Sequence, residues 1–131
     1  MSKLRPNAPD IEQYGYLLKQ LAGAFRRRID EQLRDRDLPL SNAQMTVLFV
    51  IEEEPGASGA ELARRMLISA QAISTILRRL ERGGYISRAS DPANQRRRRW
   101  QLTRKAHNAL ARAKRAVRPI MARMLGDLTP A

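Results

Sequence analysis

Four hydrogen-bonding side chains lie at helical spacing within residues 69–82, and their types suit contact with DNA bases. Gln71 could pair bidentately with adenine, and Arg78 could reach guanine or a phosphate. Ser74 and Thr75 could contact base edges or phosphates. Exposed Gln, Ser and Arg are also common on ordinary surface helices, so these residues by themselves leave that simpler explanation open.

A helix over residues 69–82 would hold these side chains on one side. Ser69 can cap it, and Ala70 begins its first turn. Its apolar residues share the other side and comprise Ile73, Ile76, Leu77 and Leu80. A shorter helix is predicted just before it, over residues 58–66, opened by a capping box of Ser58 and Glu61. Two such helices in succession predict a helix-turn-helix.

An arginine-rich hairpin is predicted next. Residues 85–89 and 97–103 alternate as strands do, and the turn-rich residues 90–95 join them. Residues 96–99 are four arginines, and one at the hairpin tip could enter a narrow minor groove, where the potential is most negative. Arg98 and its neighbours alternate faces, so they cannot all contact one phosphate backbone. Such a run can also be a solvated face, an RNA-binding patch or a nuclear-localisation patch.

Helices are predicted on both sides of this module. Residues 10–36 carry one apolar stripe, made up of Ile11, Tyr14, Leu18, Leu21, Phe25, Ile29 and Leu33. Ser41 and Gln44 form a capping box for a second helix. From Arg104 the helical spacing returns, and Pro119 is expected to kink or interrupt that helix. The predicted fold is mainly α with a small β-hairpin.

The positive charge is concentrated in the second half of the chain, within a formal net charge of +12. Residues 1–57 have eight Lys and Arg against nine Asp and Glu, residues 58–103 have ten against three, and residues 104–131 have seven against one. A basic balance suits nucleic acid, an anionic membrane or an acidic protein. Its segregation onto the predicted helix-turn-helix favours a polyanion, because phosphate neutralisation supplies most sequence-independent affinity for DNA.

Catalytic and metal-binding groups are scarce. The chain has no cysteine, which excludes disulfides, thiolate metal sites and thiol switches. His107 is the only histidine, and a lone His is more often structural than catalytic. Residues 52–54 are consecutive glutamates whose side chains diverge on a helix, so we expect a solvated cluster. Tyr85 and Trp100 are expected in the hairpin core rather than in a base-stacking platform. We therefore expect no enzyme, no cofactor and no metal.

Length and hydropathy predict one soluble domain. The 131 residues can enclose one core of ordinary size. The longest apolar run, residues 45–51, is much shorter than a membrane span, and residues 1–10 lack the apolar segment of a signal peptide. We expect a cytoplasmic, nucleoid-associated protein with no membrane partner.

Residues 38–103 closely resemble the MarR family of bacterial transcription regulators. The matching pieces are, in order, Leu38-x-Leu40-Ser41-x-x-Gln44, Glu61-Leu62-Ala63, Leu80-Glu81-Arg82-Gly83-Gly84-Tyr85-Ile86 with Arg88, Asp91-Pro92, Arg96, and Leu102-Thr103. No single piece is specific, but their order and spacing together are.

The resemblance implies a homodimer that binds double-stranded DNA. It assigns residues 10–36 and 104–131 to dimerisation helices and residues 41–103 to a winged helix-turn-helix lobe. The fourth helix would enter the major groove through Ser69, Ala70, Gln71, Ser74, Thr75 and Arg78. The hairpin, or wing, would enter the minor groove through Arg88, Asn94, Arg96 and Arg98.

The resemblance also implies a pocket for a small aromatic or anionic effector between the dimerisation helices and the lobe. Tyr14, Tyr16 and Met45 are weak candidates for its lining. Core packing is the simpler role for Tyr14 and Met45.

Three positions depart from the family pattern. Asn94 stands where an acid usually precedes the wing arginine, and it lacks the charge that would anchor Arg96. Ala106 replaces a common glycine, with little expected effect. Residues 128–130 match the usual opening of the last helix but only Ala131 follows, so part of the dimer interface is expected to be missing. A dimer is expected nonetheless, because the apolar stripe of residues 10–36 is too large to hide within one lobe.

The sequence thus predicts a sequence-specific transcriptional regulator, a repressor, that binds a pseudo-palindromic operator and is released by a small molecule. The alternative is a nucleoid-type or RNA-associated basic protein that binds polyanions with little sequence preference. The two differ in how strongly they prefer one DNA sequence over random DNA.

Overall fold

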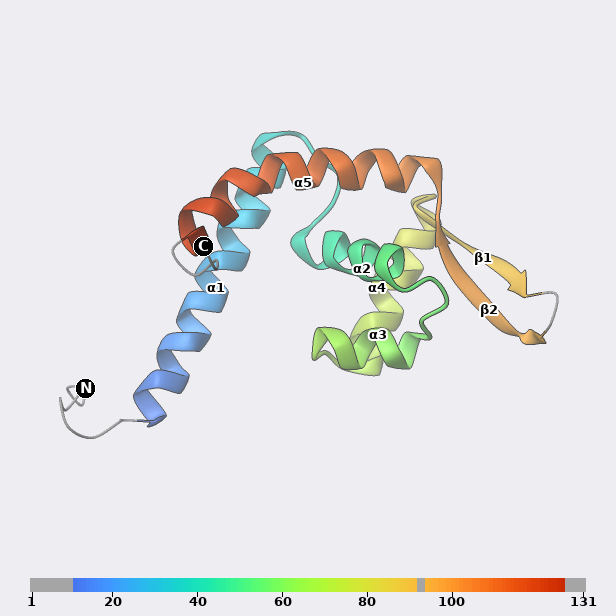
Figure 1. Cartoon of the computed structure of the whole chain (residues 1–131), viewed down its shortest axis with the longest axis horizontal. Coiled ribbons are helices and arrows are strands. Elements are labelled where there is room, and N and C mark those ends of the chain that lie inside the picture. Colours follow the sequence, from blue (N-terminus) through green and yellow to red (C-terminus); the bar gives the residue numbers. More distant parts are fainter. Residues whose placement is uncertain (1–10, 92–93, 127–131) are drawn as a thin grey trace.

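Helices and one antiparallel hairpin make up the described part of the chain. The computed structural model describes residues 11–91 and 94–126, and for residues 89–91 and 94–99 it describes the backbone alone. The elements in chain order are α1 (Ile11–Asp35), α2 (Asn42–Glu53), α3 (Gly59–Met66), α4 (Ala70–Arg82), β1 (Ile86–Asp91), β2 (Asn94–Leu102) and α5 (Arg104–Leu125). Figure 1 shows α5 lying above α2, with the hairpin at one side and α1 reaching away at the other. The predicted fold class is confirmed.

Side-chain hydroxyls open four of these helices, each accepting a hydrogen bond from a backbone N–H three residues on. They belong to Ser41, Ser58, Ser69 and Thr103. The predicted box at Ser41 is complete, because its own N–H also donates to Gln44 Oε1 at 3.0 Å. At Ser58 only the hydroxyl half forms, with the Glu61 N–H at 3.1 Å. These caps set where the helices begin, as the sequence predicted.

Two hydrophobic cores organise the molecule. The first lies among α2, α3, α4, the hairpin and the start of α5, and includes Leu48, Leu62, Ile73, Leu80 and Trp100. The second joins α1 to the later turns of α5 through Ile29, Leu33, Ala113, Val117 and Ile120. Met45 packs against both cores. The helix-turn-helix lobe and the α1–α5 arm are thus connected through α2.

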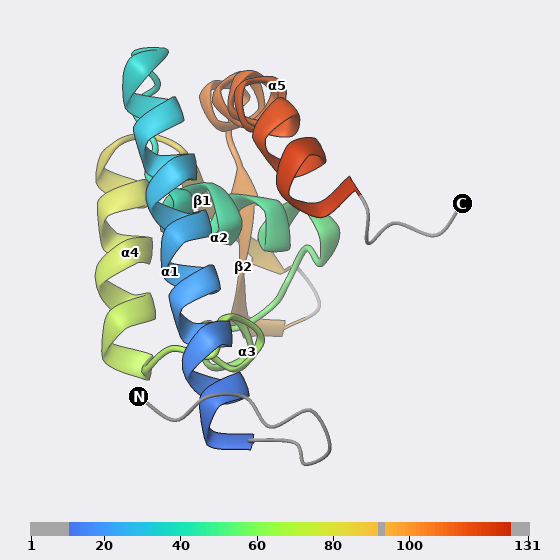
Figure 2. The ribbon, with the colours of Figure 1, turned by 90° about the vertical axis from the view of Figure 1, so that its left-hand side faces the viewer.

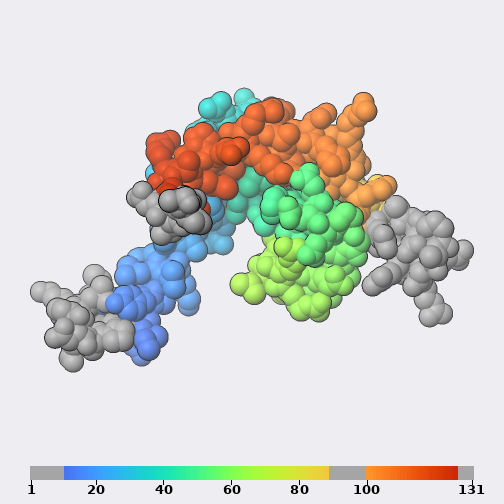
Figure 3. All heavy atoms as spheres, in the orientation of Figure 1, coloured from blue at the N-terminus to red at the C-terminus, as the bar shows by residue number. Residues whose placement is uncertain are grey.

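The first half of α1 is uncovered. Of its predicted stripe, only Ile29 and Leu33 are buried. The exposed members are Ile11, Tyr14, Leu18 and Leu21. Figure 3 shows this half of α1 projecting from the molecule, with an open concavity between it and the lobe on that face. The expected core packing of Tyr14 is wrong within one chain, because its side chain is 46% exposed and belongs to neither hydrophobic core of the described residues.

The hairpin is longer than predicted. Its second strand begins at Asn94 rather than at residue 97, and its first extends to Asp91, so the predicted six-residue turn is wrong. Pairing runs from Ile86 opposite Leu102 to Ser90 opposite Arg98, and a register shift then places Asp91 opposite Asn94. The antiparallel ladder continues into the polar segment because it satisfies backbone groups whatever the side chains are.

Pro119 does not interrupt α5, which runs through it to Leu125. Proline has no N–H to donate to the carbonyl of Arg115, and its ring crowds that turn. Figure 2 shows the first turns of α5 end-on while its last turns run obliquely, so the helix bends. Ile120, which directly follows the proline, belongs to the second core together with Ile29 and Leu33 of α1.

Candidate functional site

The polar face of α4 is displayed on the surface of the lobe. Ile73, Leu77 and Leu80 are buried in the first core and hold the helix in place. The predicted contact residues all lie exposed, and they are Ser69, Ala70, Gln71, Ser74, Thr75 and Arg78. The structure therefore brings together on one surface the side chains that the sequence singled out for base and phosphate contact.

Two hydroxyls of this set already have partners. Ser69 Oγ accepts from the Ala72 N–H at 3.0 Å, which makes it the N-cap of α4. Thr75 Oγ1 donates to the Gln71 carbonyl at 3.1 Å. Ser69 keeps its hydroxyl hydrogen for an external acceptor, whereas Thr75 keeps lone pairs for an external donor. Among the side chains that the structure describes, none forms an ion pair with Arg78.

Arg88 has a structural role in addition to its predicted place among the wing residues. Its guanidinium lies 4.5 Å from the centroid of the Trp100 ring, and its Nε lies 3.8 Å from Glu81 Oε2. Glu81 is on α4, so these contacts join the base of the hairpin to that helix. Tyr85 and Trp100 are both buried, which confirms their predicted place in the core.

The hairpin base is also bonded to α5. Thr103 Oγ1 lies 2.6 Å from the Gly84 carbonyl, and Lys105 Nζ donates to the Gly83 carbonyl at 2.7 Å. Lys105 Nζ also lies 4.6 Å from the centroid of the Tyr85 ring. The base of the wing is therefore held from α4 on one side and from α5 on the other.

The wing contact residues are placed through their backbone. Asn94, Arg96 and Arg98 all belong to β2, and Arg98 pairs with Ser90. Their side chains lie outside the described set, as do residues 128–130, where the last-helix motif falls. Their predicted roles at the minor groove stay predictions.

The three consecutive glutamates diverge as predicted, but two of them have partners. Glu54 Oε1 lies 2.8 Å from Arg65 Nη1. Glu52 contacts two groups on α5, with Oε1 2.8 Å from Lys114 Nζ and Oε2 3.6 Å from His107 Nδ1. His107 thus faces an acidic side chain across the α2–α5 boundary. Within the described ranges, no three His, Asp or Glu side chains are grouped as metal ligands would be.

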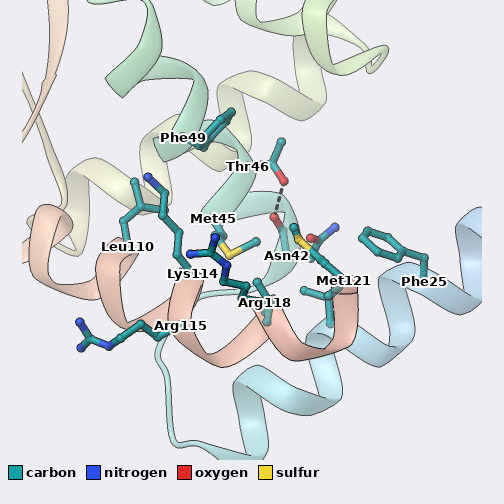
Figure 4. Close-up of a pocket in the computed structure, with 12 residues that line it drawn as sticks. Phe25, Asn42, Met45, Thr46, Phe49, Leu110, Lys114, Arg115, Arg118 and Met121 are labelled. Atoms are coloured by element: carbon teal, nitrogen blue, oxygen red, sulfur yellow. Dashed lines mark hydrogen bonds between the residues drawn. The ribbon is translucent and has the colours of Figure 1, made fainter. Parts of the chain in front are cut away.

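A pocket of about 460 Å³ lies where α1, α2 and α5 meet. Its lining is mostly apolar and includes Phe25, Ile29, Met45, Phe49, Leu110, Val117 and Met121. Three cations, Lys114, Arg115 and Arg118, line it from α5. In Figure 4, Lys114 and Arg118 extend toward α2, whereas the guanidinium of Arg115 points away from the other side chains. Asn42 and Thr46 add a polar edge, with Thr46 Oγ1 donating to the Asn42 carbonyl at 2.8 Å.

Of the three predicted pocket residues, only Met45 lines this cavity. Tyr14 and Tyr16 lie on the exposed half of α1, where the Tyr16 hydroxyl accepts from Gln20 Nε2 at 2.9 Å. The missed residues are Phe25, Phe49, Lys114 and Arg118, which come from three helices. Phe25 could be singled out as part of the α1 stripe, but nothing in the sequence pairs it with Phe49.

The described helices give no sign of a membrane span, since none combines the required length with sufficient hydropathy.

The arrangement of α3, α4 and the hairpin places this chain among the winged helix-turn-helix proteins. The model of the MarR family matches residues 37–97. The HTH-type transcriptional repressor Rv2887 of Mycobacterium tuberculosis is 33% identical over 120 residues, which are 92% of this chain and 85% of that protein. The chain belongs to the MarR family.

Two solved structures of the M. tuberculosis protein agree with this assignment. Its complex with salicylic acid has a TM-score of 0.74 and 32% identity, covering 96% of this chain and 89% of that chain. Its complex with DNA has a TM-score of 0.67 and 32% identity, covering 94% of this chain and 87% of that chain.

Proposed function

We propose that this chain is a transcriptional repressor that binds its operator as a homodimer and is released by a small aromatic anion. The observation that carries the proposal is the two-sided construction of α4. Its apolar side is locked into the lobe while Gln71, Ser74 and Arg78 are exposed on the outer side. Hydrogen-bonding groups on a rigid helix are what base-specific contact in the major groove requires. The related M. tuberculosis protein is a transcriptional repressor and has been solved in complex with DNA, which supports the proposal that this chain binds DNA.

The homodimer rests on α1. Large apolar side chains on its first half are exposed, including Leu18 at 66% and Leu21 at 56%. Apolar surface of this kind is stabilised by burial against another chain. We assign α1 and α5 to dimerisation, and residues 41–103 to DNA binding. A two-fold dimer predicts half-sites separated by about one helical turn, roughly 10 bp.

The pocket suits a small aromatic carboxylate. Its lining is mostly apolar with two phenylalanines, and Lys114 and Arg118 of α5 also line it. Apolar walls bind an aromatic ring, and the cations favour its negative charge. The relative's complexes with salicylic acid and p-aminosalicylic acid support this ligand class. We further propose that the protein acts in the cytoplasm on nucleoid DNA, without a cofactor.

Selection of bound sequences from a random DNA library tests this function. The expected result is a pseudo-palindromic motif whose half-sites have the stated spacing. Competition at moderate salt should then show a preference for that motif over random DNA of at least about a thousandfold. Equal loss of binding to all sequences as salt rises would instead favour the nucleoid-type or RNA-associated alternative.

A further inference from the structure

Lys114 connects α5 to α2 beside the pocket. It extends from α5, where it lines the cavity, and its Nζ reaches Glu52 Oε1 of α2 at 2.8 Å. The same Nζ lies 5.2 Å from the centroid of the Phe49 ring, which forms part of the pocket wall. A carboxylate and an aromatic ring therefore already surround this ammonium group, and an aromatic carboxylate bound in the pocket would offer it the same two partners.

Little stability is lost when Lys114 leaves Glu52 for another partner. Both side chains are partly exposed, at 46% for Lys114 and 36% for Glu52, and ion pairs in such settings contribute little stability. Glu52 also keeps a second neighbour, because His107 Nδ1 lies 3.6 Å from its other oxygen. The flexible four-carbon stem of lysine allows its charge to move between partners without moving the helix.

The other two cations of the pocket differ from Lys114. The guanidinium of Arg115 points away from the cavity in Figure 4. Arg118 extends toward α2, and among the described residues no carboxylate pairs with it. Of these three cations, Lys114 is thus the one that forms an ion pair with a carboxylate among the described residues.

We propose that Lys114 determines the preference of the pocket for a carboxylate, and that Glu52 is an internal competitor that sets the affinity. This inference rests on the proposed effector pocket. A bound carboxylate must replace Glu52 as the partner of Lys114. The measured association constant therefore equals that of the open pocket multiplied by the fraction of molecules in which the Lys114–Glu52 pair is open. Glu52 belongs to the DNA-binding lobe and Lys114 to the α1–α5 arm. Ligand binding that breaks their ion pair therefore also removes one contact between the lobe and the arm.

Calorimetric titration of the full chain with salicylate and with its uncharged analogue salicylamide tests this inference. The variants are Glu52→Gln and Lys114→Met, with Glu53→Gln as the matched control because Glu53 is the adjacent exposed carboxylate of α2. Glu52→Gln should tighten salicylate binding about two- to fivefold, the factor that an exposed ion pair is worth, and leave salicylamide binding unchanged. Lys114→Met should remove the preference for salicylate, and Glu53→Gln should behave as the unaltered chain.

The possible failures are distinguishable. If the unaltered chain binds neither compound, the proposed effector pocket is wrong and this inference falls with it. If both compounds bind but Glu52→Gln changes nothing, or Lys114→Met keeps the preference, this inference alone is overturned. Loss of the preference in Arg118→Met, with Lys114→Met unaffected, would assign the carboxylate to Arg118 instead. Lys114→Gln replaces Lys114→Met if circular dichroism shows that the methionine variant does not fold.

Discussion

The guanidinium of Arg88 stacks 4.5 Å from the centre of the Trp100 ring while its Nε faces Glu81 of α4. One side chain therefore joins the two strands of the wing to each other and to α4. Trp100 is the only tryptophan of the chain, so its fluorescence reports on this contact.

Arg88→Met should loosen the wing base. Loss of the ring contact and of an exposed ion pair should cost about 0.5–2 kcal/mol of unfolding free energy. Guanidinium titration followed by Trp100 emission measures this, and the native emission should shift to the red as the ring becomes more exposed. Arg64→Met, at an exposed position on α3, is the control and should change neither quantity. An unshifted native emission in Arg88→Met would show that the stacking is not maintained in solution.

Gln71→Ala should relax base preference. A bidentate contact to adenine is worth about 1–3 kcal/mol of discrimination, so the selected motif should lose that preference at one position per half-site. Repeating the library selection with the variant measures this. Asn108→Ala removes an exposed amide on α5 and should leave the motif unchanged. An identical motif from Gln71→Ala would mean that the base-contacting surface lies elsewhere.

Arg96→Ala should weaken binding most where the minor groove is narrow. Such grooves concentrate negative potential and favour an inserted arginine. Fluorescence anisotropy compares duplexes that share the operator core but differ in an A-tract at the expected wing position. Arg99→Ala, which removes the same charge from the same strand, separates a positional effect from a general one. Equal losses in both variants, on both duplexes, would make the wing a nonspecific contact.

Leu18→Glu with Leu21→Glu should dissociate the dimer. Both side chains are exposed on the uncovered half of α1, and a charge buried there without a partner is costly. Analytical ultracentrifugation at micromolar concentration should show a dimer for the unaltered chain and a monomer for the variant. Lys19→Glu changes charge at an intervening exposed position and controls for the added acid. A monomeric unaltered chain would rule out this interface.

Gly83→Ala should destabilise the lobe by about 1–3 kcal/mol, as overpacking does. A Cβ at this position would lie 2.9 Å from the Tyr85 ring, which is buried and contacts Lys105 of α5. Thermal unfolding followed by circular dichroism gives the change in Tm. Gly126→Ala is the control, since a Cβ there would meet nothing within 4 Å. Equal Tm values for the two variants would mean that the Tyr85 ring can move aside.

The helix-turn-helix is predictable from the sequence because the signals for it are local. Ser58 and Ser69 cap α3 and α4 within three residues of their partners, and the two faces of α4 follow from helical periodicity alone. The hairpin was predicted in kind but not in length. The length of the hairpin depends on backbone pairing that continues past a register shift, and the side-chain pattern does not predict such a shift.

Only the tertiary structure shows how the helices pack against one another, and therefore which side chains stay exposed and which charges meet. The exposure of Leu18 and Leu21 depends on where α5 ends its contact with α1, and the pocket exists because α1, α2 and α5 meet. Lys114 and Glu52 are 62 residues apart in the chain, and each alone is an ordinary surface charge. Local periodicity determines which face of a helix is apolar. Only the packing of distant segments determines which neighbour covers that face, and which charges meet at its edge.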